Sequence, residues 1–123
     1  MACRITDLVL NCADPEALAP FWCAVLGYEV LDADETGVSI GPPGGGARPG
    51  LTLLRSADRK VGTLRLHLDV NATDGDQDTE LARLLAVGAR PVEIGQTGQE
   101  SWDVLADPEG HEFCLLRSTV APA

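Results

Sequence analysis

The chain has 123 residues, of which 45% are hydrophobic and 23% charged, and this size and composition suit a single globular domain with one modest core. Only 4% of the residues are aromatic, so aliphatic side chains must fill most of that core. The 9 basic and 19 acidic residues give a formal charge of −10, which disfavours nucleic acid or an anionic membrane surface as a partner.

Neither a membrane span nor a secretory leader is indicated by the sequence. There is no apolar run of about 18 residues, and no basic segment followed by an apolar one at the N-terminus. We therefore expect a cytoplasmic protein. Its four scattered cysteines lack a C-x-x-C pair, and in a reducing compartment they are expected to be free thiols that mostly act as small buried side chains.

The first half of the chain predicts a strand followed by a helix. The strand is the apolar run from Ile5 to Leu10, and Asp14 followed by Pro15 has the form of a helix N-cap with proline at the first helical position. Apolar side chains then recur at helical spacing until Gly27, a typical helix end. Pro20 would remove a helical hydrogen bond, so we expect either a late helix start or a kink.

The second half repeats this order. A strand at 64–70 leads through the acidic loop 74–80 into a leucine-containing helix that Gly88 ends, and Pro91 opens the next extended run. The acidic loop fails as a calcium loop because Thr79 stands where glycine is required. It is better interpreted as a solvated helix entry, where acidic side chains are favourable.

Three matches between the halves predict a duplicated chain. The segment "LVLNCA" at 8–13 aligns with "LHLDVN" at 66–71, Leu26-Gly27 with Val87-Gly88, and "LTLLRS" at 51–56 with "FCLLRS" at 113–118. The predicted strands lie near 5–11, 29–34, 37–41, 51–55, 63–70, 90–95, 101–106 and 112–117. We expect an α+β domain of two tandem β-α-β-β-β modules, at about 4–56 and 62–118, forming one cupped mixed sheet with helices on its outer face.

This duplicated pattern resembles the vicinal oxygen chelate superfamily of glyoxalases, bleomycin-resistance proteins and extradiol dioxygenases. The similar segments are "ADPEALAPFWCAVLGYEV" at 13–30 and "SWDVLADPEGHEFCLL" at 101–116, which look most like a glyoxalase-like actinobacterial branch. The resemblance implies binding of a small organic molecule in a cleft between the modules, and a homodimer. The alternative is a metal-dependent or histidine-based lyase, isomerase or dioxygenase acting on a small carbonyl or aromatic substrate.

In metal-dependent members of this superfamily, four inward side chains supply the ligands. Carried over position by position, they fall on Asp7, Thr52, Arg65 and Cys114. Arginine has no free lone pair and stays protonated, so the resemblance implies a degenerate site with no metal cofactor. One variant remains open: Asp7, His67 and Cys114 offer mixed oxygen, nitrogen and sulfur donors that would suit zinc.

The same resemblance gives the predicted lining of the ligand cleft: Asp7, Thr52, Arg65, His67, Trp102 and Cys114. Asp7 and Arg65 would face each other as a salt bridge or as a charge pair that orients a ligand. His67 is either a general base or a hydrogen-bonded pocket residue. Cys114 is either a nucleophile or apolar filling. Trp102 would offer a flat apolar surface.

Two further side chains are expected at structural positions. Trp22 follows the helical spacing of its neighbours and is expected in the core or an interface. His111, in the Glu-Gly-His turn, is expected at the surface.

Overall fold

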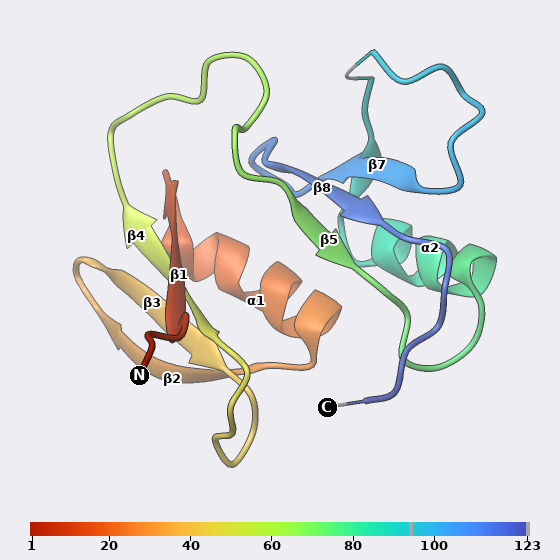
Figure 1. Cartoon of the computed structure of the whole chain (residues 1–123). Coiled ribbons are helices and arrows are strands. Elements are labelled where there is room, and N and C mark those ends of the chain that lie inside the picture. The colour runs from red at the N-terminus through yellow and green to blue at the C-terminus, as the bar shows by residue number, and fades with distance from the viewer. Residues whose placement is uncertain (94, 123) are drawn as a thin grey trace. The chain divides into compact units, whose positions relative to one another are not determined.

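The computed structural model describes residues 1–93 and 95–122, which form two compact units, Met1–Arg59 and Lys60–Ala123. The first unit contains β1 (Asp7–Cys12), α1 (Pro15–Leu26), β2 (Glu29–Asp34), β3 (Gly37–Gly41) and β4 (Gly50–Arg55). The second contains β5 (Leu68–Val70), α2 (Gln77–Ala86), β6 (Arg90–Pro91), β7 (Asp103–Ala106) and β8 (Glu112–Leu115). Each unit therefore has the predicted β-α-β-β-β order (Figure 1).

The two units share one sheet topology. Strand order is β1-β4-β3-β2 in the first and β5-β8-β7-β6 in the second. In both, the first and last strands pair in parallel and the remaining pairs are antiparallel. The α+β class and the tandem repeat are confirmed, and the strands are hydrogen-bonded in two sheets of four where the sequence predicted one mixed sheet.

Helix α1 is delimited by the residues that the sequence indicated. The Asp14 carboxylate accepts a hydrogen bond from the Ala17 amide at 3.2 Å, and Gly27 ends the helix in the left-handed region at φ 68°. The helix continues through Pro20, so the predicted late start is wrong. Burial of one helix face, which includes Leu18 and Trp22 at 1% exposure each, offsets the lost hydrogen bond.

Helix α2 begins at the predicted acidic entry. The Asp76 carboxylate accepts a hydrogen bond from the Thr79 amide at 2.8 Å. The Gln77 amide group donates to the Ser101 carbonyl at 2.9 Å and to the Asp103 carboxylate at 3.1 Å. These contacts attach the start of α2 to β7.

Strand alternation sorts each sheet into two faces. Leu51 and Leu53 of β4 are buried, as are Phe113 and Leu115 of β8. The residues between them, Thr52 and Cys114, point to the opposite face of their own sheet. We call these the Thr52 face and the Cys114 face.

The strands of the first unit match the predicted ranges closely, whereas those of the second are shorter. The strand expected at 63–70 is reduced to Leu68–Val70, and the one expected at 90–95 to Arg90–Pro91. Ile94, which falls in that second range, lies outside the described residues.

Within residues 1–93 and 95–122, no helix is long and apolar enough to cross a membrane. The four cysteines are free thiols, and Cys12 and Cys114 are buried as expected, whereas Cys3 is exposed.

Candidate functional site

A short chain of hydrogen bonds crosses the Thr52 face of the first sheet. The Thr52 hydroxyl donates to the Asp7 carboxylate at 2.8 Å, and Ser39 Oγ lies 3.2 Å from Thr52 Oγ1. Since the single hydroxyl proton of Thr52 goes to Asp7, Ser39 is the donor in the second bond. Both hydroxyl protons are then used inside the chain, and acceptor lone pairs remain on Asp7 and Ser39.

Gly50 leaves room for this arrangement. A Cβ at that position would lie 2.9 Å from Asp7 Oδ1 and 3.2 Å from the Ile40 carbonyl oxygen. The sequence indicated Asp7 and Thr52 as site residues, but the prediction missed Ser39, which pairs directly with Thr52 in the β3–β4 hairpin. Hairpin register could have indicated it, because directly paired residues share a face.

In the second unit, Arg65 and His67 are both exposed and precede β5 instead of belonging to it. The cause lies in Glu112, which is 6% exposed. Its carboxylate accepts a hydrogen bond from the Leu64 amide at 3.4 Å and forms an ion pair with Lys60 at 2.8 Å. The Leu64 amide thus bonds to a side chain where a longer strand would use a neighbouring backbone carbonyl.

Backbone pairing also corrects the alignment of the two halves. Val9 pairs with Thr52 in the first sheet, and Asp69 pairs with Cys114 in the second. If Thr52 and Cys114 are counterparts, Val9 corresponds to Asp69. By the same register, the counterpart of Asp7 is His67. The assignment of Arg65 to that position is therefore wrong.

The corrected alignment has support in the sequence. "LVLNCAD" at 8–14 then aligns with "LDVNATD" at 68–74 and matches at leucine, asparagine and aspartate. With this alignment, the difference in residue number between corresponding positions of the two halves increases in small, even steps along the chain, as expected when insertions fall in loops. Both alignments keep the same strand face, so His67 stays among the candidate residues.

Cys114 is 8% exposed on the Cys114 face. Burial raises the pKa of its thiol, and the charge of Asp69 raises that pKa further. A nucleophilic cysteine requires the opposite shift. The apolar-filling interpretation therefore fits Cys114 better than the nucleophile interpretation.

His111 is buried, at 7% exposure, and the prediction of a surface position is wrong. Its Nδ1 lies 2.8 Å from Oδ2 of Asp107, a residue with 0% exposure that directly follows β7. Asp107 Oδ1 also accepts hydrogen bonds from the amides of Glu109 at 2.9 Å and His111 at 3.0 Å. This pair holds the turn between β7 and β8 and has a structural role.

Trp102 borders a pocket of about 440 Å³ within the second unit. Its side chain is 44% exposed. The pocket lies between the start of β7 and the preceding loop, and its lining comprises Pro91, Val92, Glu93, Gln96, Thr97, Gly98, Glu100, Trp102, Asp103 and Val104. Val104 belongs to the Cys114 face, because it pairs with Cys114, and Trp102 lies just before β7. Trp102 therefore borders a pocket of the second unit, its predicted place in a cleft between the modules stays a prediction, and Trp22 is a core residue.

The donor chemistry gives little support for a metal centre. In the described part of the chain, no group of three His, Cys, Asp or Glu side chains is arranged to hold a metal ion. Thr52 already donates to Asp7, and the Cys114 thiol would have to lose its proton against a raised pKa. His67 is the one candidate ligand with an exposed imidazole.

Comparison with known proteins places these features in a family. The sequence profile of the glyoxalase-like domain matches residues 7–116, whereas no functionally curated protein matches the chain. TnmS3, an antibiotic-binding protein from Streptomyces sp. CB03234, has 22% identity and a TM-score of 0.65, with 95% of this chain and 98% of that chain covered.

Two further solved structures have the same fold. A glyoxalase/bleomycin resistance protein/dioxygenase family enzyme from Burkholderia phytofirmans PsJN has 15% identity and a TM-score of 0.66, with 89% of this chain and 94% of that chain covered. A variant of the fosfomycin resistance protein FosX from Listeria monocytogenes, complexed with Mn(II) and 1S,2S-dihydroxypropylphosphonic acid, has 14% identity and a TM-score of 0.70, with 98% and 94% covered. Identities this low show the fold alone.

Proposed function

The chain belongs to the glyoxalase-like domain family, and on that premise we propose that it binds a small organic molecule directly, without a resident metal ion. The observation that carries this proposal is the pocket of about 440 Å³ beside Trp102. Small-molecule pockets commonly span roughly 300–1,000 Å³ and combine an aromatic surface with a few polar groups. TnmS3 binds an antibiotic on the same fold, which supports this kind of function.

The second part of the proposal concerns the residues. Trp102 provides a flat apolar surface, and the neighbouring Gln96 and Thr97 provide neutral polar groups for orientation. The six-residue set predicted from the sequence, Asp7, Thr52, Arg65, His67, Trp102 and Cys114, remains a prediction as a single ligand site. The homodimer and the cytoplasmic location also remain predictions.

A thermal-shift screen of metabolites and aromatic natural products tests this function. We expect at least one compound to raise the melting temperature in a concentration-dependent way in the presence of a chelator. The Trp102→Ala variant should lose that response, while Trp102→Phe should retain part of it. A complete lack of hits, or hits that Trp102→Ala leaves unchanged, would contradict the proposal.

One observation favours a second candidate function, an enzyme of the lyase, isomerase or dioxygenase type. His67 has an exposed imidazole at the position that corresponds to Asp7 in the repeat. An imidazole there could act as a general base, or could bind a divalent ion together with Asp7 and Cys114. Loss of turnover of a carbonyl substrate in His67→Gln, with ligand affinity retained, would favour this candidate.

A further inference from the structure

We propose that the Trp102 pocket takes an organic cation with a planar apolar body. This inference rests on the proposed function and specifies the class of its ligand. Arg65, predicted from the sequence to grip an anionic group in a cleft between the modules, is not among the residues that line this pocket.

The charge of the pocket lining is the first argument. In the lining that the structure describes, each ionisable side chain is a carboxylate: Glu93, Glu100 and Asp103. Among these lining residues an anionic ligand would meet like charges, whereas a cationic ligand would be attracted. Arg117 lines the adjoining pocket, which shares Glu100, Trp102 and Asp103.

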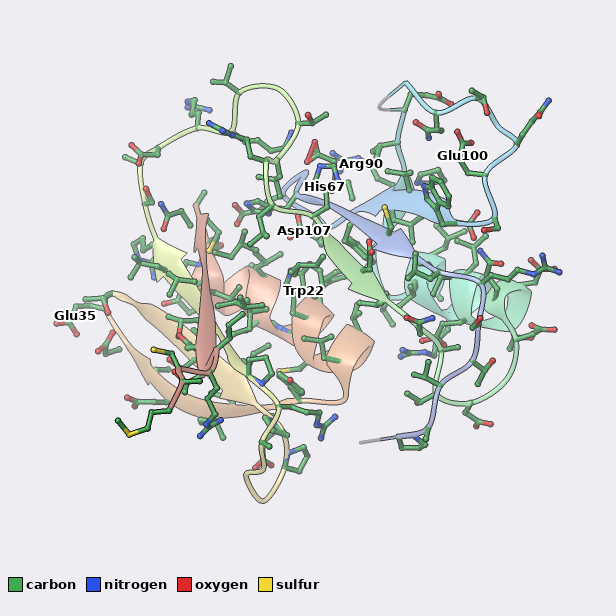
Figure 2. The ribbon with its side chains drawn as sticks, in the orientation of Figure 1. Trp22, Glu35, His67, Arg90, Glu100 and Asp107 are labelled. Atoms are coloured by element: carbon green, nitrogen blue, oxygen red, sulfur yellow. The ribbon has the colours of Figure 1, made fainter. Side chains whose placement is uncertain are left out.

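The state of Glu100 is the second argument. Its carboxylate accepts hydrogen bonds from the Thr97 amide at 2.7 Å, the Thr97 hydroxyl at 3.1 Å and the Gly98 amide at 2.9 Å. These bonds, led by the one from the Thr97 amide, lower the pKa of Glu100 and keep it ionised. Figure 2 shows Glu100 inside the curve of the loop before β7. Its charge is therefore held in place next to the pocket.

Trp102 is the third argument. With 44% of its side chain exposed beside these carboxylates, the indole offers both an apolar surface and an electron-rich ring face. Planar cations gain from stacking and from the cation–π interaction at such a ring. Neutral planar molecules gain only the stacking.

The first unit carries unused hydrogen-bond acceptors of its own. Its Ser39–Thr52–Asp7 chain uses both hydroxyl protons internally and leaves acceptors exposed. Such a chain binds hydrogen-bond donors, which ammonium and amidinium groups supply. The formal charge of −10 also raises the local concentration of cations around the protein.

Three acridines of nearly equal shape test the charge preference: 9-aminoacridine, acridine and acridine-9-carboxylate, which are cationic, neutral and anionic slightly above neutral pH. Equilibrium dialysis against the full chain should show that 9-aminoacridine binds at least about ten-fold more tightly than the carboxylate. Raising the salt concentration should weaken binding of the cation.

Charge variants locate the effect. Glu93→Gln and Glu100→Gln should each lower the affinity for 9-aminoacridine by about three-fold, which is the effect expected for one partly exposed charge pair. Glu35→Gln, at the turn between β2 and β3 in the first unit, removes the same charge from a residue that does not line the pocket, and it should leave the affinity unchanged. Trp102→Ala should abolish binding. Because Glu93 is exposed, Glu93→Gln remains informative even if Glu100→Gln disturbs the loop.

Three results would overturn this inference: equal affinity for the cation and the anion, no difference between Glu93→Gln and Glu35→Gln, or no binding of any acridine. Equal affinities for the cationic and anionic acridines would refute only the preference for a cation and would leave the proposed small-molecule function unchanged. If no acridine binds, the charge inference fails, and the thermal-shift screen in the presence of a chelator decides separately whether the chain binds a small molecule.

Discussion

Replacement of Asp107 by alanine should destabilise the protein severely. The carboxylate is fully buried and accepts hydrogen bonds from the His111 ring and from two backbone amides, at 2.8–3.0 Å. The variant would remove the shared acceptor of these donors, of which the His111 ring and amide are buried and the Glu109 amide is half-buried. A buried donor without an acceptor costs about 1–3 kcal/mol, and partial solvation of the enlarged turn would recover some of that cost. We expect a loss of about 3–5 kcal/mol in the free energy of unfolding.

Asp107→Asn separates the charge from the hydrogen bonds. The asparagine oxygen can still accept from the Glu109 and His111 amides, so only the charge-assisted bond to the His111 ring is weakened. We expect a loss of about 1–2 kcal/mol for this variant. Asp74→Ala, in the exposed loop before α2, provides a matched control that should stay within about 0.5 kcal/mol of the parent.

Urea unfolding followed by far-UV circular dichroism measures these differences. The unfolding midpoint of Asp107→Ala should fall well below that of Asp107→Asn, and the slope of the transition should stay constant. If Asp107→Ala lowers the free energy of unfolding by less than about 1 kcal/mol, the buried Asp107–His111 pair does not hold the β7–β8 turn.

Three other outcomes follow from the structure. Lys60→Met should cost about 1–2 kcal/mol near neutral pH, because it removes the ion pair of the buried Glu112. Burial opposes ionisation of Glu112, yet Lys60 and nearby amides lower its pKa overall. The ion pair therefore stabilises the protein fully above the usual glutamate pKa, and the difference in unfolding free energy between Lys60→Met and the parent should shrink as pH falls through the lowered pKa. A difference that stays constant with pH would contradict this. Gly37→Ala should cost about 3 kcal/mol or more in urea unfolding, since the new Cβ would meet the Leu53 carbonyl oxygen. Titration with Ellman's reagent should modify the exposed Cys3 fast and the two buried cysteines slowly; equal rates would contradict their burial.

The sequence predicted the fold well where local signals and burial agree. Asp14, Pro15 and Gly27 delimit α1 as expected, and β2 and β3 have the predicted bounds. Pro20 suggested a late helix start or a kink, and the late start is wrong because the buried face of α1 offsets one missing hydrogen bond. That balance depends on tertiary packing, which the local sequence does not contain.

The candidate site was harder to predict, for two physical reasons. Two leucine matches between the halves favoured an alignment that differs from the one given by backbone pairing but keeps the same strand face. Arg65 was therefore aligned with Asp7, whereas backbone pairing aligns His67 with Asp7. Side-chain bonds inside turns also carry no periodic signal, so the burial of His111 on Asp107 was missed. Trp102 was predicted to line a cleft between the modules, which stays a prediction; the pocket that it borders lies within the second unit.

The central claim is that this glyoxalase-like chain binds its ligand without a resident metal ion. Elemental analysis after incubation with zinc, nickel, manganese or iron(II) and desalting tests it most directly. We predict far less than one equivalent of any metal per chain, in the parent and in His67→Ala alike. One equivalent in the parent that is lost in His67→Ala would contradict the claim and would establish His67 as a metal ligand.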